Sequence, residues 1–345
     1  MPQHLDPSFE TYRRDLIHIP SKQWEGETEL VLHKEYNNKS PKFSVIIPVH
    51  NQDDFVVKQI ESILSNTLGH YEIITILDNC TDNSKENLLG RIAAGPMPEN
   101  LSSITVFENQ AGMFETSADN LGFAKARGEI LIEIQADMEI LTTGYNLNLA
   151  YPLKIYSDLI AVSGRCCHSI NKNSLAFNVG KLGGKVETPH ETLHHYDNYN
   201  AIFLSHSINR GPLAISKEKI AKLGYLDEFH YCLGEDDHDL FLRAWKEKKW
   251  RTGFMPIEFH SPLDRGSTRR PRTPGSKYSL QQRKKRQAEG YFSINQKTAT
   301  YPSSEIRRPS STEKILALQS LMTPGIEQLQ LAQSKTVITM MHKDN

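Results

Sequence analysis

One stretch decides how the chain folds: residues 130–139 read Ile-Leu-Ile-Glu-Ile-Gln-Ala-Asp-Met-Glu. Its first five residues are apolar except for Glu133, and this pattern predicts a strand. The end of the strand presents the carboxylate of Asp137, and Glu139 follows two residues later. A carboxylate at a strand's end is a natural ligand for a metal or a substrate. Asp also commonly begins a turn there, so this stretch alone leaves both interpretations open.

Upstream of this strand, apolar runs alternate with helical patterns. The runs at 43–48, 71–77 and 103–107 predict strands, and apolar residues at a 3.6 period predict a helix from about residue 55, with further helices after Asp82 and over 117–127. Strands that alternate with helices predict an α/β fold with a mostly parallel sheet and helices on both faces.

Ligands of such sheets bind beyond the carboxyl ends of the strands. Three turns should therefore share one rim: Pro48-Val49-His50-Asn51, Asp78-Asn79 and Gln135-Ala136-Asp137. The first turn lacks the G-x-G-x-x-G pattern of dinucleotide-binding enzymes, which argues against a nicotinamide cofactor.

A second acidic stretch lies about a hundred residues downstream of the first. Glu235, Asp236, Asp237 and Asp239 lead into a helix whose apolar face begins at Leu240. Acids in a first turn stabilise the helix dipole, but capping needs only one or two of them, so the surplus indicates a further role. A late strand is expected over 254–260, ending at His260.

Composition excludes some classes of protein and leaves others open. The 345 residues carry a net charge of −1, which gives no general reason to expect nucleic acid as a partner. A basic segment at 264–286 fits either a solvated tail or a loop for an anionic ligand. His190, His194 and His195 lie in a loop-rich region without H-E-x-x-H, which favours surface or substrate-loop histidines over a zinc site.

The expected location follows from the cysteines and from the hydropathy of the chain. The four cysteines include no C-x-x-C pair, which favours a reducing compartment. The first residues do not resemble a signal peptide, and no apolar run reaches the roughly 20 residues that span a bilayer. We expect a cytoplasmic protein that could touch a membrane peripherally.

Taken in order, these motifs resemble those of the inverting glycosyltransferases of family 2, which have the GT-A fold. The resemblance covers residues 43 to 260. The segments that carry it are 43–51, 78–82, 120–128, 135–137, 211–213 with 224–227, and the pair Glu235-Asp236 followed by Arg243. The sequence departs from the family pattern at Gln135, where the first acid of D-x-D is expected, and at His50 and Asn79.

The resemblance implies a nucleoside-diphosphate sugar as donor, most simply a UDP-sugar, and a hydroxyl acceptor on a glycan, a lipid-linked molecule or a protein. Mn²⁺ or Mg²⁺ would neutralise the leaving diphosphate. Asp137 and His260 would bind the metal, Asp236 would be the general base, and Glu235 would position the acceptor or the sugar. The expected donor-binding residues are Pro48, His50, Asn51, Asp78, Asn120, Arg127, Gln135, Ala136 and Gly211.

The expected organisation has three parts. Residues 1–40 are expected to form an extension. Residues 41–262 would form the GT-A domain, with a nucleotide-sugar-binding half at 41–140 and an acceptor half at 141–262. Residues 263–345 would contain a basic loop and a C-terminal extension. Gln135 keeps an alternative open, namely a non-catalytic sugar-nucleotide-binding or scaffold protein with a degenerate metal site. Fold alone does not decide between the two.

Overall fold

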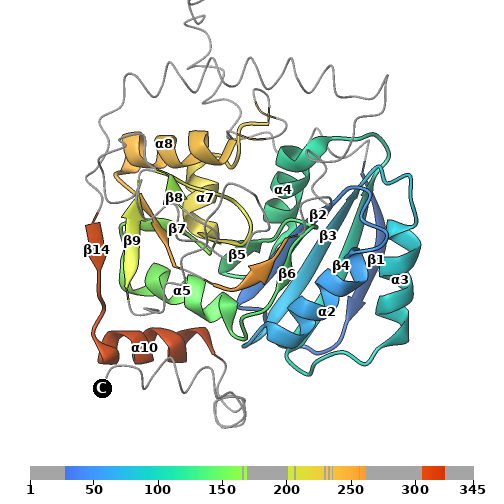
Figure 1. Cartoon of the computed structure of the whole chain (residues 1–345), viewed down its shortest axis with the longest axis horizontal. Helices are drawn as coiled ribbons and strands as arrows, with labels where there is room; N and C mark the ends of the chain where they lie inside the picture. Colours follow the sequence, from blue (N-terminus) through green and yellow to red (C-terminus); the bar gives the residue numbers. More distant parts are fainter. Residues whose placement is uncertain are drawn as a thin grey trace, which may run out of the picture.

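The computed structural model describes residues 28–164, 167–168, 201–205, 207–228, 231, 234, 236–255, 257–261 and 305–322. Within them, one ten-stranded sheet runs through the molecule, with helices on both faces (Figure 1). In spatial order its strands are β1 (Thr28–Glu35), β4 (Leu101–Asn109), β3 (Tyr71–Asp78), β2 (Phe43–Val49), β5 (Ile130–Glu133), β11 (Leu213–Ser216), β7 (Leu159–Ser163), β12 (Arg251–Phe254), β9 (Ile202–Ser205) and β14 (Glu305–Arg307).

The predicted parallel sheet is confirmed in its first half. Strands β4, β3, β2 and β5 are parallel neighbours, as expected for strands joined by crossover helices. Beyond β5, strand β11 is antiparallel to both β5 and β7, while β12 is parallel to β7. Strands β2 to β5, β7 and β12 therefore all point the same way, and their carboxyl ends share one edge.

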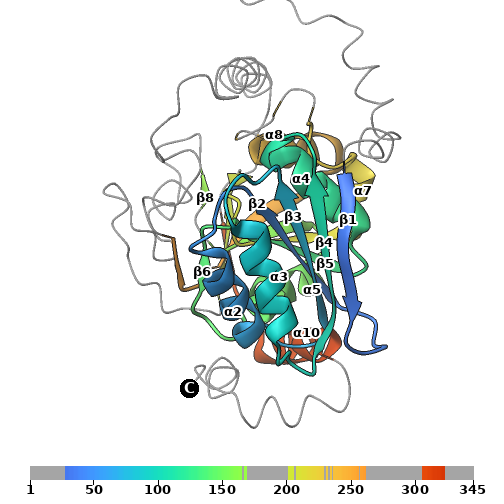
Figure 2. The same cartoon turned by 90° about the vertical axis from the view of Figure 1, so that its right-hand side faces the viewer.

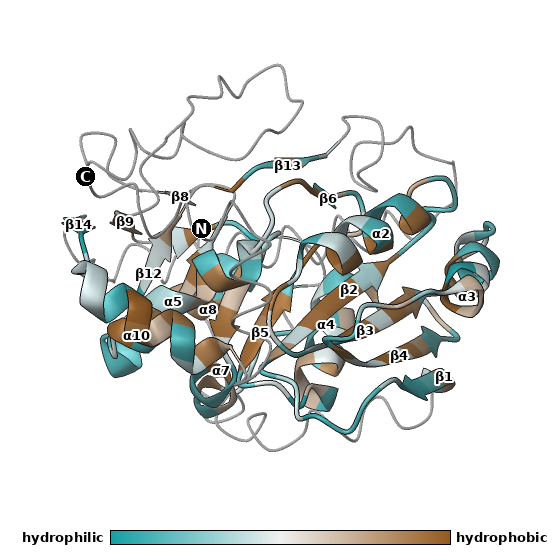
Figure 3. Ribbon diagram, turned by 90° about the horizontal axis from the view of Figure 1, so that it is seen from below, coloured by the Kyte–Doolittle hydropathy of each residue, from teal (hydrophilic) through white to brown (hydrophobic). Residues whose placement is uncertain are grey.

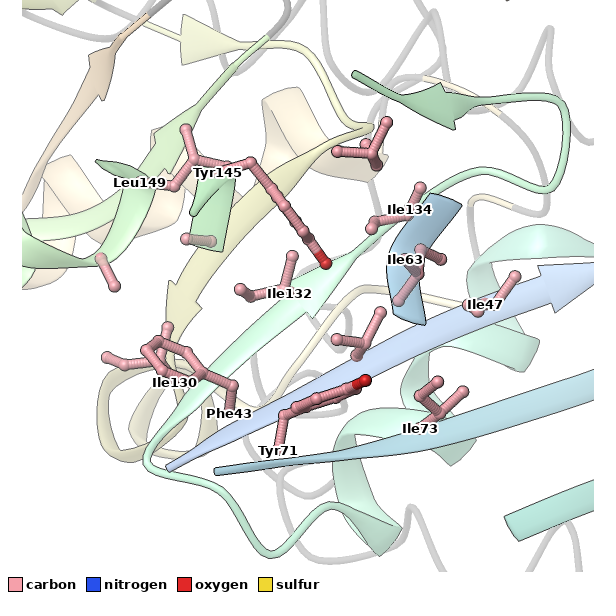
Figure 4. Close-up of a cluster of buried hydrophobic side chains, with 14 of the residues drawn as sticks. Phe43, Ile47, Ile63, Tyr71, Ile73, Ile130, Ile132, Ile134, Tyr145 and Leu149 are labelled. Carbon is pink, nitrogen blue, oxygen red and sulfur yellow. The ribbon is translucent and has the colours of Figure 1, made fainter. Parts of the chain in front are cut away.

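Each face of the sheet has its own hydrophobic core. On β2, Val45 and Ile47 face α2 (Val56–Asn66), α3 (Ser84–Ala94), α5 (Tyr145–Ile155) and α10 (Ser311–Leu321), whereas Ile46 faces α4 (Phe114–Lys125), α7 (Lys217–Leu223) and α8 (Asp236–Lys248). Both sides are buried, which is why the central strands are continuous apolar runs, as Figure 3 shows. Figure 4 shows the first core, where Tyr145 packs among isoleucine side chains.

Helix α4 lies very close to the sheet because of one glycine. A Cβ on Gly122 would overlap Cγ2 of Ile46 and would lie 3.2 Å from Cδ1 of Ile76. The glycine of the Asn120-Leu121-Gly122 motif is therefore required by packing between the helix and β2 and β3.

Two segments that the sequence indicated as extensions contribute to the folded domain. Strand β1 pairs antiparallel with β4 at the edge of the sheet (Figure 2). At the other end of the chain, β14 pairs with β9, and α10 packs on α5, with Lys314 Nζ 5.4 Å from the ring centre of Tyr151. The described parts of both segments extend the sheet and its cores.

The late strand expected over 254–260 is divided in the structure. Strand β12 ends at Phe254, and a separate short strand β13 (Phe259–His260) pairs antiparallel with β6 (Glu139–Ile140). A second small sheet joins β8 (Cys167–His168) to β10 (Ser207–Ile208). The division matters for function, because it brings His260 beside the end of the stretch that contains Asp137.

Candidate active site

The three turns predicted to share a rim lie together at the carboxyl edge of the sheet. In the parallel register, Pro48 lies beside Ile76 and Val49 beside Leu77, so the first two turns leave the sheet side by side. His50 Nδ1 is 2.7 Å from the carbonyl oxygen of Asp78. The side chain of Asn51 accepts a hydrogen bond from the amide of Thr81 at 2.8 Å. These contacts join the first and second turns into one surface.

Asp78 is positioned by hydrogen bonds to its own carboxylate. Its two oxygens accept hydrogen bonds from the backbone amides of Met113 and Phe114 at 2.7 and 2.9 Å, and from the side chain of Asn109 at 3.0 Å. A carboxylate satisfies amides at the beginning of a helix well. Asp78 therefore fixes the start of α4 at the rim, in addition to any contact with a ligand.

The predicted metal ligands Asp137 and His260 come from neighbouring segments of the β6–β13 sheet. His260 pairs with Glu139 in register, and its Nδ1 is 3.5 Å from the Glu139 carboxylate. The next residue, Ser261, donates from its hydroxyl to the Asp137 carboxylate at 3.2 Å. Carboxylate and hydroxyl oxygens suit Mn²⁺ and Mg²⁺, and an imidazole nitrogen is a common ligand of divalent transition metals. The residues present at this position therefore fit a divalent cation.

A buried group of charges lies between the rim and α8. Arg210 forms ion pairs with Asp119 of α4 and with Asp236 of α8, and its Nη1 is 3.6 Å from the Glu115 carboxylate. Glu133, the last residue of β5, accepts a hydrogen bond from the amide of Gly211 at 3.0 Å. Asp119, Glu133 and Asp236 are completely buried. We call Arg210 with Glu115, Asp119, Glu133 and Asp236 the Arg210 cluster.

The cluster connects the two acidic stretches that the sequence singled out. The side-chain amide of Gln135 donates to Glu115 at 2.7 Å, Glu115 lies beside Arg210, and Arg210 pairs with Asp236. Asp236 also accepts a hydrogen bond from the Thr116 hydroxyl at 2.6 Å. The turn that carries Asp137 and the beginning of α8 thus meet through a continuous set of contacts.

Burial and crowding shift the pKa values of the cluster. Burial raises the pKa of Glu133 to about 8; Arg210 opposes that shift and Glu115 adds to it. Burial also raises the pKa of Asp119 well above its usual range, against the effect of Arg210. For Arg210, burial disfavours the charge, but the surrounding carboxylates outweigh it and raise its pKa. Arg210 therefore stays charged, while Glu133 and Asp119 hold protons more strongly than exposed acids do.

Glu115, Asp119 and Glu133 also satisfy a simple geometric criterion for a metal site. One oxygen from each lies within 4.8 Å of the others. However, the Arg210 guanidinium already contacts Asp119 and Glu115, and a metal ion there would be repelled by it. We assign Arg210 as the cation of this group.

At Gly211 the backbone that follows Arg210 packs closely against the first acidic stretch. Its φ is +61°, and a Cβ at this position would lie 2.9 Å from Sδ of Met138 and 3.0 Å from Cγ of Gln135. Only a glycine allows the segment after Arg210 to pack this tightly on the turn that carries Gln135 and Ala136. Gly211 thus lies against the side chains of Gln135 and Met138.

Two of the expected donor-binding residues have other surroundings. Arg127 lies at the amino end of the strands, where it binds Glu72 at 2.8 Å and Glu35 at 3.2 Å, so it is at the opposite edge from the rim. Asn120 is buried and exchanges two hydrogen bonds with the backbone of Leu226, at 2.9 and 3.0 Å. The structure does not bring either residue to the other predicted donor contacts. Glu235, the histidines at 190–195 and the basic segment lie outside the described residues.

Sequence reasoning missed Arg210, Glu115, Asp119 and Ser261. Glu115 and Asp119 are four residues apart, and this spacing places them on one face of a helix. The predicted helix began at residue 117, so Glu115 fell outside it, whereas α4 begins at Phe114. Glu133 gave a clearer signal, since it is a charged residue within an otherwise apolar, buried strand.

Comparison with known proteins relates part of the chain, including the rim turns, to a known family. Residues 44–165 match the model of Glycosyl transferase family 2. Over these residues the chain resembles glycosyltransferase family 2. The match agrees with the family predicted from the sequence over these residues, and the largely parallel central sheet confirms the predicted α/β fold. The matched segment includes the rim turns and Asp137.

Curated relatives resemble only part of the chain. "Glycosyltransferase GlyG" from Streptococcus pneumoniae serotype 4 is 33% identical over 99 residues, which are 28% of this chain and 31% of the relative. "Uncharacterized glycosyltransferase YibD" from Escherichia coli K12 is 31% identical over 130 residues, 38% of this chain and 36% of the relative. The chain thus spans about a third of the length of these relatives.

Among solved structures, the mannosyltransferase PcManGT from Pyrobaculum calidifontis, in complex with GDP-Man and Mn²⁺, aligns with a TM-score of 0.47 and 17% identity. The alignment covers 96% of this chain and 90% of that one. Among the helices that the structure describes, none is both long enough and apolar enough to cross a bilayer.

Proposed function

We propose that the chain is a metal-dependent inverting glycosyltransferase that moves a sugar from a nucleoside-diphosphate sugar to a hydroxyl acceptor. One observation carries the proposal: the turn that contains Asp137, the proposed metal ligand, is connected to Asp236 through Gln135, Glu115 and Arg210. Inversion needs a donor-activating group and a base on opposite sides of one anomeric carbon. The contact path supports such an arrangement.

The rim would bind the donor. His50 is exposed and Asn51 is half-buried, and His50 lies beside Asp78. These polar groups suit recognition of the edge of a nucleobase, and uracil is the base that we propose. Pro48, Ala136 and Gly211 shape the surface, with Gly211 allowing close approach of the backbone. Asn120, which bonds the backbone of Leu226, and Arg127, which pairs with Glu72 at the opposite edge of the sheet, are not part of this surface.

Asp137 and His260 would hold Mn²⁺ or Mg²⁺, with Ser261 orienting the Asp137 carboxylate. A bound divalent cation would supply charge neutralisation for the departing diphosphate. Asp137 is 5% exposed, so its carboxylate is held in place before a ligand arrives. A preorganised ligand of this kind costs little reorganisation at the moment of reaction.

Asp236 would take the proton of the attacking hydroxyl. Its Oδ2 is anchored by Arg210 and Thr116, whereas Oδ1 has no hydrogen-bond partner among the described residues. A base needs one oxygen that can accept a proton, and Oδ1 fits that role. Because Asp236 is buried, the acceptor must uncover Oδ1 on binding. Glu235, the adjacent acid, would position the acceptor, for which a glycan, a lipid-linked molecule or a protein hydroxyl are the proposed classes.

A second candidate is a sugar-nucleotide-binding protein without catalysis. It is favoured by Gln135, whose neutral amide stands where the family has an acid and donates to Glu115. Calorimetry with UDP-sugars, with and without Mn²⁺, separates the two. Binding that requires Mn²⁺, accompanied by slow hydrolysis of the donor, supports the enzyme. Binding that is indifferent to Mn²⁺, without hydrolysis or transfer, supports the binding protein.

A further inference from the structure

We propose that Arg210 is a positioning residue for Asp236: it keeps that carboxylate ionised and holds Oδ2, so that Oδ1 is the oxygen that accepts the proton. This inference rests on the proposed function, in which Asp236 is the base. Arg210 lies in the segment between β10 and β11, outside the residues matched to the family model.

Geometry is the first support. Arg210 is 5% exposed, and its two terminal nitrogens point to different helices, Nη1 to Asp119 of α4 and Nη2 to Asp236 of α8. A guanidinium is planar, so fixing one nitrogen fixes the direction of the other. Asp119 therefore orients the guanidinium, and the guanidinium orients Asp236.

Charge balance is the second support. Glu115, Asp119, Glu133 and Asp236 lie around Arg210, and Asp237 also acts on it electrostatically. One positive charge cannot neutralise all of these acids, and unpaired buried charge is costly. Burial favours the protonated forms of Glu133 and Asp119, which lessens the negative charge around Arg210, and the direct ion pair with Arg210 favours the ionised form of Asp236.

The alternative is that Arg210 only stabilises the fold. Arg243 offers a matched control, because it is also a buried arginine and pairs with a buried acid of α8, Asp239, at 2.7 Å. Arg243 also donates to the carbonyl oxygens of Leu223 and Tyr225 at 2.7 Å, which are not part of the Arg210 cluster. A purely structural role predicts the same behaviour for variants at both arginines.

The first test does not need activity. Thermal unfolding is measured for Arg210→Gln, Asp236→Asn and the double variant, because residues in one charge network show non-additive effects. We expect Arg210→Gln to melt at a lower temperature than the wild type and the double variant to recover part of that loss, since it removes an acid that had lost its cation. Strictly additive losses would overturn the ion pair. If Arg210→Gln does not fold, Arg210→Lys takes its place.

The second test follows the rate of sugar transfer against pH, with UDP-sugar donors and Mn²⁺. We expect Arg210→Lys to lower kcat about tenfold or more, to leave donor KM within about twofold, and to move the acid limb of the profile to higher pH, since the base loses its fixed cation. Arg243→Lys should lower thermal stability and leave the limb in place. An unmoved limb in Arg210→Lys would overturn the proposal. If the wild-type chain transfers no sugar, the proposed function is wrong and so is the role of Oδ1. The unfolding measurements on Arg210→Gln, Asp236→Asn and the double variant would still decide whether the Arg210–Asp236 ion pair exists.

Discussion

Ser261 donates its hydroxyl to the carboxylate of Asp137 at 3.2 Å, although the two residues are 124 positions apart in the chain. The bond connects the end of the β5 segment to the end of β13, and it fixes the residue on which the proposed metal site depends. Because outer partners of metal ligands tune affinity, this hydrogen bond should be measurable in metal binding.

Replacement of Ser261 by Ala should weaken the Mn²⁺-dependent part of donor binding by about tenfold, and replacement of Asp137 by Asn should weaken it further. The reason is that the first change loosens the carboxylate, and the second removes its charge. Isothermal titration of a UDP-sugar at several Mn²⁺ concentrations gives both values. Glu61→Gln, at an exposed acid of α2, is the control and should bind as the wild type does. Equal affinities in all four proteins would contradict the assignment of Asp137.

Glu133 should make the folded protein less stable as the pH rises. In the folded state burial raises its pKa to about 8, above the usual value of 4.5, so between these values the folded chain binds more protons than the unfolded chain does. The free energy of unfolding should then fall with rising pH in that window, by up to about 1.4 kcal/mol per pH unit for each proton. Glu133→Gln keeps the size of the side chain and should flatten the slope. Urea unfolding from pH 5 to 8 measures it, and an unchanged slope would show that Glu133 is ionised throughout.

Two glycines in helices should respond to alanine in opposite directions. At Gly122 an added methyl group overlaps Ile46, so Gly122→Ala should lower the free energy of unfolding by about 1–3 kcal/mol. At Gly90, on the exposed face of α3, a Cβ meets nothing within 4 Å, and alanine should raise stability by about 0.5–1 kcal/mol. Chemical denaturation of both variants tests the close packing of α4 on β2. A neutral Gly122→Ala would mean that the helix can move away from the sheet.

Arg127 was expected from sequence to contact the donor, but its position predicts a structural role. Its partner Glu72 is a nearly buried carboxylate at the amino edge of the sheet, so Arg127→Ala should lower stability by about 1–3 kcal/mol. Donor affinity should stay within about twofold of the wild type, because the residue lies at the edge opposite the rim. A tenfold loss of donor affinity in a folded Arg127→Ala protein would return Arg127 to the binding site.

The sequence predicted the repeated units of the fold because periodicity is a local property. Apolar runs such as 43–48 and 71–77 matched β2 and β3, and their order along the chain was enough to place the rim turns on one edge. Strand β1 was missed because it lies at the edge of the sheet, where its short apolar run, Leu30-Val31-Leu32, stands among exposed and half-buried polar residues.

The site was less predictable because its contacts join distant segments. The sequence indicated Asp137 and His260 because they follow or end predicted strands. It indicated Asp236 because it lies among surplus acids at the start of a predicted helix. Arg210 did not stand out, since an isolated arginine is usually a solvated surface residue, and only the folded chain surrounds it with acids from α4, β5 and α8. Asn120 and Arg127 were selected from one sequence motif. In the structure Asn120 bonds the backbone of Leu226, and Arg127 forms an ion pair with Glu72 at the amino edge of the sheet.

The most direct measurement compares sugar transfer by the wild type, Asp236→Asn and Asp239→Asn in the presence of Mn²⁺. Both variants neutralise a buried aspartate of α8 that is paired with an arginine, but only Asp236 belongs to the Arg210 cluster. We expect Asp236→Asn to lower turnover by about 10²-fold or more while donor affinity stays nearly unchanged, and Asp239→Asn to retain turnover. Turnover at the wild-type level in Asp236→Asn would contradict its role as the general base.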